Sequence, residues 1–230
     1  MISFVVPAYN EERYLAATLE SIHAAAKSVG EPYEIVVADD ASTDGTPQIA
    51  LSGGARVVRV ENRQISKTRN SGARIASGEY LVFVDADTRI DDSVLRAALD
   101  ALRSGAVGGG AGVRLDHAPA WAHAVTRALL TSFRWLGLAA GCFVFCTREA
   151  FDTVGGFDEA YFGAEELVIS RALARVGRFV VLREAVTTSG RKLHGRTAWD
   201  VFRITARVVL RGHRGVLRRE GMEFWYEDRR

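Results

Sequence analysis

The chain has 230 residues, of which 48% are apolar and 25% charged, the proportions of an ordinary folded protein. Length and composition exclude a disordered, collagenous or coiled-coil chain and predict one domain, with or without a short appendage. The two cysteines, Cys142 and Cys146, are too few for a disulfide framework, and no second Cys/His cluster offers a zinc site. A reducing, cytoplasmic setting fits this cysteine usage best.

The net charge of +2 hides a difference between the body of the chain and its end. Residues 1–182 hold 18 Lys and Arg against 22 Asp and Glu, whereas residues 183–230 hold 12 against 6. A basic tail indicates an anionic partner such as a lipid surface, a phosphate or nucleic acid, or else a solvated helical face. Neither a targeting peptide before the first strand nor an apolar membrane span is expected.

The first hundred residues alternate apolar runs with segments of helical spacing. The expected strands are Ile2–Val6 (stopped by Pro7), Glu34–Ala38, Val57–Val60 and Tyr80–Val84. The expected helices are residues 12–29, Lys67–Ala76 and a segment that Asp91 or Asp92 caps and Gly105 ends. Continuous apolar strands alternating with helices predict an α/β fold with a mostly parallel sheet and helices on both faces.

The second half of the chain is less regular. We expect an extended segment at Gly108–Leu115 and an amphipathic helix at Trp121–Leu136. A strand is expected at Cys142–Thr147, followed by a turn at Gly155–Glu159. A helix at Glu165–Val176 and a strand at Phe179–Leu182 complete this half. A longer helix is expected to begin near Thr197. Its arginines recur every three or four residues, which is typical of a basic amphipathic helix on anionic lipid. No RNA-binding motif accompanies these charges, so a nucleic-acid partner is not expected.

Carboxylates stand at the ends of two predicted strands, as Asp39-Asp40 and as Asp85-Ala86-Asp87. Ligands of an open α/β sheet bind beyond the carboxyl ends of its strands, where these acids would meet. Asp-x-Asp can hold a divalent cation that bridges diphosphate oxygens and neutralises charge on a leaving group. Asp also caps helices and forms turns, so the pattern alone does not require a metal. The first strand is not followed by G-x-G-x-x-G, which disfavours a dinucleotide oxidoreductase.

Five ordered motifs resemble those of family 2 glycosyltransferases. They are Val5–Glu12, Val37–Thr46, Lys67–Gly72 followed by Ala76–Tyr80 and Asp85–Asp87, Val154–Glu159, and Glu165-Glu166. Together they cover roughly residues 2–192. The resemblance implies a GT-A-type fold and an inverting glycosyltransferase, which moves a sugar from a nucleotide-diphosphate donor to an acceptor hydroxyl in one metal-assisted displacement.

The resemblance also divides the chain and assigns residues to the nucleotide. It implies a glycosyltransferase domain over 1–196, with a nucleotide-binding half at 1–100 and an acceptor half at 101–196, followed by a basic helical tail at 197–230. The residues implied to line the nucleotide pocket are Pro7, Tyr9 and Glu11, with Tyr9 against the base. Asp40 would accept a hydrogen bond from the base, and Arg69 would face the base or the diphosphate.

The same resemblance places a divalent cation, Mg²⁺ or Mn²⁺, at the Asp-x-Asp segment. Asp85 would contact the ribose or the metal, and Asp87 would ligate the metal. Arg191 would close over the diphosphate. Asp44 is interpreted as the turn residue of the segment Thr43-Asp44-Gly45.

The pair Glu165-Glu166 departs from the family, which usually has Glu-Asp at these positions. The second acid of the pair is typically the general base that deprotonates the acceptor hydroxyl, and here it is Glu166. Because Glu has one more methylene than Asp, its carboxylate must be set back or the acceptor placed differently. Both acids also suit the first turn of a helix, where the helix dipole favours negative charge.

The implied partners are a nucleotide-diphosphate sugar and an acceptor that is a glycan or is lipid-linked. An anionic membrane surface is a further expected partner of the tail, at the inner face of the membrane. Two other functions remain open. The Glu-for-Asp change allows a non-catalytic nucleotide-sugar-binding protein. A metal-dependent nucleotidyltransferase also uses acids on an α/β sheet, although the Gly-rich, basic phosphate loop expected of it does not follow the first strand.

Overall fold

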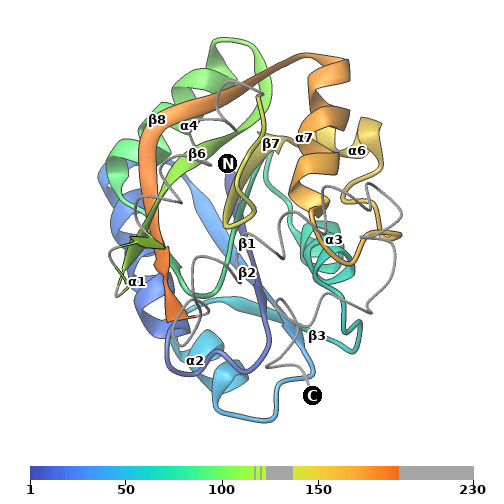
Figure 1. The fold of residues 1–230 in the computed structure, drawn as a ribbon. Coiled ribbons are helices and arrows are strands. Elements are labelled where there is room, and N and C mark those ends of the chain that lie inside the picture. Colours follow the sequence, from blue (N-terminus) through green and yellow to red (C-terminus); the bar gives the residue numbers. More distant parts are fainter. Residues whose placement is uncertain (117, 120, 123–136, 192–230) are drawn as a thin grey trace.

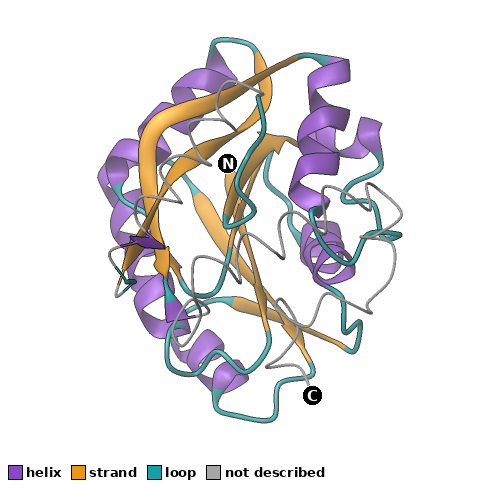
Figure 2. Cartoon of the chain, in the orientation of Figure 1, coloured by secondary structure: helices purple, strands orange, loops and turns teal. Residues whose placement is uncertain are grey.

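The structure is a computed structural model that describes residues 1–116, 118–119, 121–122 and 137–191. Its strands are β1 (Ile2–Ala8), β2 (Tyr33–Asp40), β3 (Arg56–Val60), β4 (Tyr80–Val84), β5 (Thr88–Arg89), β6 (Ala106–Asp116), β7 (Phe143–Thr147) and β8 (Arg178–Ser189). Its helices are α1 (Leu15–Val29), α2 (Thr46–Ser52), α3 (Ile65–Ile75), α4 (Asp92–Arg103), α6 (Arg148–Val154) and α7 (Glu165–Val176). The strands form one sheet in the order β3-β2-β1-β4-β7-β6-β8-β5. Helices α1, α2 and α4 cover one face, and α3, α6 and α7 cover the other (Figures 1 and 2).

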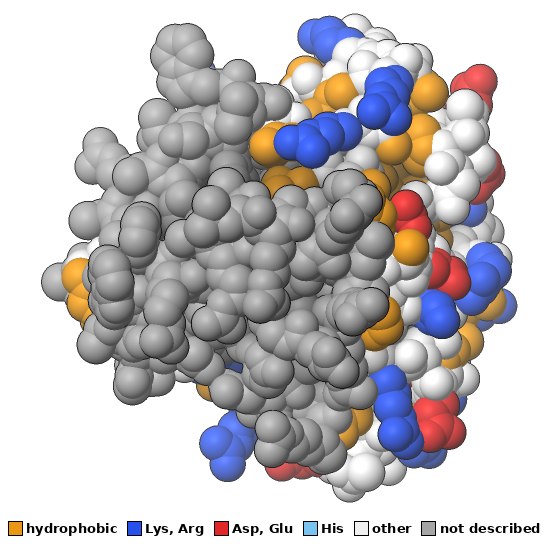
Figure 3. All heavy atoms as spheres, turned by 45° about the vertical axis from the view of Figure 1, so that its right-hand side comes forward, with side chains coloured by type: hydrophobic (Ala, Val, Ile, Leu, Met, Phe, Trp, Pro, Cys, Tyr) orange, Lys and Arg blue, Asp and Glu red, His pale blue; other side chains and the backbone are white. Residues whose placement is uncertain are grey.

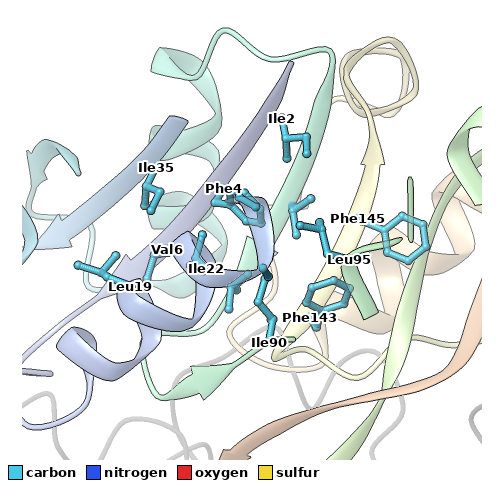
Figure 4. Close-up of a cluster of buried hydrophobic side chains, with 14 of the residues drawn as sticks. Ile2, Phe4, Val6, Leu19, Ile22, Ile35, Ile90, Leu95, Phe143 and Phe145 are labelled. Atoms are coloured by element: carbon cyan, nitrogen blue, oxygen red, sulfur yellow. The ribbon is translucent and has the colours of Figure 1, made fainter. Parts of the chain in front are cut away.

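The two faces of the sheet bury different side chains, because residues alternate along each strand. Phe4 and Val6 of β1 lie in a cluster with Leu19 and Ile22 of α1 and Leu95 of α4 (Figure 4). The intervening residues of β1, β2 and β4 pack in a second cluster with α3, α6 and α7. Burial on both faces makes these strands continuous apolar runs, which is why the sequence located them.

The predicted α/β fold and its parallel nucleus are confirmed. β1 pairs in parallel with β2 and β4, and β2 pairs in parallel with β3. Beyond β4 the sheet is mixed, since β7 is antiparallel to both β4 and β6. The sequence ended the first strand at Pro7, but β1 continues to Ala8. The pairing of β1 with β4 ends at Val5, so the missing N–H of Pro7 costs no bond on that side.

Short elements were missed by periodicity. α2, α6 and β5 have seven, seven and two residues, which is too few to show a repeat. β8 was expected only at Phe179–Leu182. It is longer because its second half pairs with the end of β6 and with β5, which are contacts made far along the chain. The tail at 197–230 and residues 123–136 of the predicted helix lie outside the described residues, so the boundary after residue 196 stays a prediction.

The surface of the described residues carries charges of both signs. On the face of Figure 3, Lys and Arg side chains are interspersed with Asp and Glu, as on an ordinary solvated surface. Among the helices that the structure describes, none combines the length and the apolar character that a membrane span needs.

Gly72 lets α3 approach the sheet. A Cβ at this position would lie 2.5 Å from Val5 Cγ1 and 3.4 Å from Ala38 Cβ, and both neighbours are fully buried. Gly72→Ala should therefore overpack this contact and lower the free energy of unfolding by about 1–3 kcal/mol. Thermal or urea unfolding measures the change. Arg74→Ala, at an exposed position of the same helix, is the control; an equal loss in both variants would contradict the packing argument.

Candidate active site

The loops after β1 and β2 are joined by hydrogen bonds between side chains and backbone. The Asn10 backbone N–H donates to the Ser42 hydroxyl (2.9 Å), and the Thr43 N–H donates to the Asn10 side-chain oxygen (2.9 Å). The Glu11 N–H donates to the Thr46 hydroxyl (2.7 Å). The two strand ends thus form one rigid edge, and Glu11 projects from it.

Asp44 has the turn role expected from the sequence. Its Oδ1 accepts from the Thr46 N–H (3.0 Å), and its Oδ2 accepts from the Glu12 N–H (3.2 Å). Burial alone would raise the pKa of Asp44, but these hydrogen bonds outweigh it and hold the pKa below its usual value. Its carboxylate is used in holding the two loops together.

Strained backbone gathers at the same edge. Four non-glycine residues of the described chain have positive φ: Asn10 (53°), Ala41 (61°), Arg63 (51°) and Ala164 (57°). The first two follow β1 and β2, and the others precede α3 and α7. Each such residue costs of order 1 kcal/mol, and such strain clusters at functional sites. The strain therefore supports a functional site at the carboxyl ends of the strands.

Asp39 and Asp40 point to opposite faces of β2 and have different surroundings. Asp40 Oδ1 accepts from the backbone N–H groups of Asn62 (2.6 Å) and Arg63 (2.9 Å), and its Oδ2 accepts from the Thr68 hydroxyl (3.0 Å). This carboxylate therefore ties the end of β2 to the start of α3.

Asp39 is fully buried, and its Oδ1 accepts a long bond from the Ser42 N–H (3.3 Å). Its Oδ2 has no hydrogen-bond donor in the described part of the chain, although the exposed Arg59 lies 3.4 Å away. A buried carboxylate oxygen without a donor is available to a ligand N–H. The sequence singled out Asp40, since adjacent acids cannot be assigned to faces before the strand is placed.

Arg69 lies at the centre of the site and is 1% exposed. Its Nη1 donates to Glu165 Oε1 (2.7 Å), and its Nη2 donates to Asp85 Oδ1 (2.8 Å) and to the carbonyl of Gly141 (2.9 Å). Burial alone would lower the pKa of Arg69, but Asp85 and Glu165 raise it above its usual value, so the side chain stays charged. Arg69 thus binds protein groups, whereas the resemblance implied that it faces a base or a diphosphate.

Glu166 has a different environment from its neighbour. Glu165 is buried and paired with Arg69, whereas Glu166 is half-buried. No hydrogen bond or ion pair joins the Glu166 carboxylate to another residue that the structure describes. Burial and the charge of Glu165 raise the pKa of Glu166 to about 8, against the opposing charge of Arg69. A carboxyl group with a pKa near neutrality that is not bound by another described residue suits a general base.

Asp87 contacts a second arginine, delivered by the end of β8. Arg191 Nη2 lies 3.3 Å from Asp87 Oδ2 and also donates to Glu11. The Ser189 N–H donates to the Asp87 carbonyl (3.2 Å), and the Thr188 hydroxyl donates to Asp87 Oδ1 (3.4 Å). Pairing of β8 with β5, directly after the Asp-x-Asp segment, thus brings Glu11, Asp87 and Arg191 together.

Two carboxylates of this site suit a divalent cation. Asp85 and Asp87 are two residues apart, and Asp87 already faces a cationic guanidinium. Mg²⁺ and similar ions are commonly held by one or two carboxylates together with water and substrate phosphates. Within the described residues, no group of three or more His, Cys, Asp or Glu side chains could hold a metal. An ion held by this pair would need its other ligands from water or from a phosphate of the substrate.

The structure gathers most of the residues that the sequence singled out. Pro7 is buried at the end of β1, and Tyr9 is half-buried just after it. Sequence reasoning missed Gly141 and Cys142, which precede β7. Their proximity to the site shows in the thiol of Cys142, whose pKa is raised by burial and by the charges of Asp85 and Asp87. A Gly-Cys pair carries no motif that would have revealed this.

Relatives of the chain are found by sequence. Residues 3–155 match the sequence model of the family described as Glycosyl transferase family 2. The low-salt glycan biosynthesis hexosyltransferase Agl6 of Haloferax volcanii is 34% identical over 115 residues, which are 50% of this chain and 28% of that protein. Alignments with three bacterial relatives cover 24–33% of those proteins, so this chain spans about a third or less of their length.

Solved structures have the same fold. The mannosyltransferase PcManGT of Pyrobaculum calidifontis, in complex with GDP-Man and Mn²⁺, superposes with a TM-score of 0.70 at 23% identity, over 92% of this chain and 64% of that one. Residues 1–349 of Staphylococcus aureus TarS, in complex with UDP-GlcNAc, give a TM-score of 0.65 at 23% identity, over 82% and 58%. The fold is that of GT-A glycosyltransferases, and the match over residues 3–155 shows that the chain belongs to glycosyl transferase family 2.

Proposed function

We propose that this protein transfers a sugar from a nucleotide-diphosphate donor to an acceptor hydroxyl, with inversion and in a single displacement. The observation that carries the proposal is the position of Glu166 beside the Asp85–Arg69–Glu165 cluster, where its carboxylate makes no hydrogen bond or ion pair with another described residue. Family membership and the nucleotide sugars bound to proteins of the same fold support it.

In this proposal the donor lies at the carboxyl ends of β1, β2 and β4, and Tyr9 lies against its base. Asp87 and Asp85 would hold a Mg²⁺ or Mn²⁺ ion, which supplies positive charge to the leaving diphosphate. Arg191 would turn from Glu11 and Asp87 to the diphosphate. Glu166 takes the proton of the acceptor hydroxyl as the oxygen attacks the anomeric carbon, and the nucleoside diphosphate leaves from the opposite side.

The two adjacent acids of β2 receive separate roles. Asp39 would accept a hydrogen bond from an N–H of the base through its buried Oδ2, which accepts no hydrogen bond from the described residues. Asp40 would shape the site by holding the loop before α3 through its three bonds. This replaces the assignment of the base to Asp40, because the Asp40 carboxylate already accepts three hydrogen bonds.

Amide substitutions separate these roles. Asp39→Asn should weaken binding of the cognate nucleoside diphosphate about tenfold, since the acceptor oxygen is lost or rotated, while the Tm stays at or above that of the wild type. Asp40→Asn should lower the free energy of unfolding by about 1–3 kcal/mol, because an amide nitrogen would face donors. Calorimetric titration and thermal unfolding measure the two effects. Wild-type nucleotide affinity in Asp39→Asn would return the base contact to Asp40.

The acceptor and the location remain proposals drawn from the sequence. The acceptor is proposed to be a glycan or a lipid-linked group. The arginines of residues 197–230 would bind an anionic membrane surface, and the protein would then lie in the cytoplasm at the inner face of the membrane. This tail lies outside the described residues.

A thermal-shift screen of nucleoside diphosphates with Mg²⁺ or Mn²⁺ tests the proposal first, because a ligand of the folded state raises Tm by mass action. Nucleotide sugars that share the base of the best ligand are then assayed for transfer and for hydrolysis. Cation-dependent binding followed by transfer is expected. Binding without turnover on any acceptor would indicate a non-catalytic binding protein, and pyrophosphate release from a nucleoside triphosphate would indicate a nucleotidyltransferase.

A further inference from the structure

Arg69 joins parts of the site that are distant in the sequence. From α3 it reaches Asp85 after β4, the carbonyl of Gly141 before β7 and Glu165 at the start of α7. Its guanidinium also lies over the ring of Phe157, 5.2 Å from the centroid. Four segments thus converge on one buried cation.

The residues beside Arg69 on α3 each serve one side of the site. Thr68 donates to Asp40 at the donor side. Asn70 donates to the Phe157 carbonyl (2.8 Å) and accepts from the Phe157 N–H (2.9 Å), which fixes the loop before α7. Arg69 lies between them and contacts both sides at once.

We propose that Arg69 is the positioning residue that couples the two halves of the reaction, by holding Asp85 on the donor side at a fixed distance from the first turn of α7, which carries Glu166. The role rests on the function proposed above. A guanidinium suits it, because its planar fork directs several N–H donors at once, whereas the ammonium group of lysine is a single point charge. Both Nη atoms of Arg69 are used in this way.

Gly141 extends the same coupling to the wall beside Glu166. A Cβ on Gly141 would lie 3.3 Å from the carboxyl carbon of Glu166 and 3.4 Å from its Oε2. Arg69 holds the carbonyl of Gly141 at 2.9 Å. Arg69 therefore fixes the backbone of Gly141, against which the Glu166 carboxylate lies. It also holds Glu165, the residue that precedes Glu166.

Charge links the same groups. Among the described residues, the charged groups with the largest effects on Glu166 are Glu165, Arg69 and Asp85. Beyond the effect of burial, the two carboxylates raise the pKa of Glu166, and Arg69 lowers it. Removing the charge of Glu165 should therefore lower the pKa of Glu166. This shift reports the charge of Glu165 beside Glu166, and it can be measured without sugar transfer.

The test uses Arg69→Lys, Glu165→Gln and the double variant in the full chain, with Arg74→Lys on the exposed face of α3 as the matched control. Arg69→Lys should lower kcat for transfer about 10²-fold, since misplacement by about 1 Å costs that much, with a smaller change in KM. The double variant should lose no more than Arg69→Lys, because both changes break one linkage. Arg74→Lys should behave as the wild type.

A second readout needs no substrate. For each variant, Tm is measured against pH with Glu166 present and with Glu166→Gln added. The difference between the two curves changes with pH around a midpoint that reports the pKa of Glu166. In Glu165→Gln this midpoint should move to lower pH. Arg69→Lys with kcat within threefold of the wild type, additive losses in the double variant, or an unmoved midpoint would each overturn the proposal. If the wild type transfers no sugar, the proposed function fails, and an unmoved midpoint in Glu165→Gln would still overturn the linkage.

Discussion

Replacing Glu166 with glutamine is expected to lower kcat about 10²–10⁴-fold, the range of a lost general base. Glutamine keeps the shape of the side chain but cannot take the proton of the acceptor hydroxyl. Donor binding should remain, because no donor contact is assigned to Glu166. Transfer rates and donor affinity, measured on the same preparation, separate the two effects.

The pH dependence of kcat/KM and of stability, compared between the wild type and Glu166→Gln, should distinguish a general base from a structural acid. With a pKa of about 8, Glu166 is mostly protonated at pH 7, so kcat/KM of the wild type should rise with pH through about 8. The folded-state pKa lies above the ordinary value near 4.5, so the folded protein holds this proton more tightly than the unfolded chain. The contribution of Glu166 to the free energy of unfolding is therefore fully present below pH 4.5 and is lost as the pH rises through 8.

Glu166→Gln should escape that loss and have a higher Tm than the wild type at pH 8, with little difference at pH 5. Glu149→Gln is the matched control, since Glu149 is an exposed acid in the first turn of α6. Wild-type kcat in Glu166→Gln would move the base to another residue. A wild type that binds donor but transfers nothing, with transfer gained in Glu166→Asp, would show that the extra methylene prevents catalysis.

Asp87→Asn is expected to remove most of the cation dependence of donor binding. The change lowers the charge available to a divalent ion and leaves Asp85 as the remaining carboxylate of the pair. Donor affinity in the presence of Mn²⁺ should fall at least about tenfold and approach the affinity measured with EDTA. Stability should change little, because Arg191 keeps Glu11 as a partner.

Titration calorimetry with and without Mn²⁺ makes this comparison, and Mn²⁺ binding seen by paramagnetic resonance reports the ion directly. Asp100→Asn, on the exposed face of α4, controls for the change in net charge. If Mn²⁺ strengthens donor binding equally in the wild type and in Asp87→Asn, the ion is held elsewhere. If Mn²⁺ has no effect on either protein, transfer does not depend on the proposed ion.

Local patterns determined much of this protein. The strands β1, β2 and β4 could be located because burial on both faces of the sheet produces a continuous apolar run of a few residues. The helix at Glu165–Val176 could be located from its helical spacing of apolar residues. The acids at strand ends were located in the same way, since a strand and its final carboxylates are contiguous.

Contacts between distant segments decided the rest. The ion pair of Arg69 with Glu165 joins residues 96 positions apart, and Arg191 reaches Glu11 across 180. The second half of β8 likewise exists only through its pairing with β6 and β5. No short-range pattern encodes such contacts, because they form when separate elements pack. The sequence therefore indicated the acids of the site. Tertiary packing decided that Glu165 pairs with Arg69, while the Glu166 carboxylate pairs with no other residue in the described part of the chain.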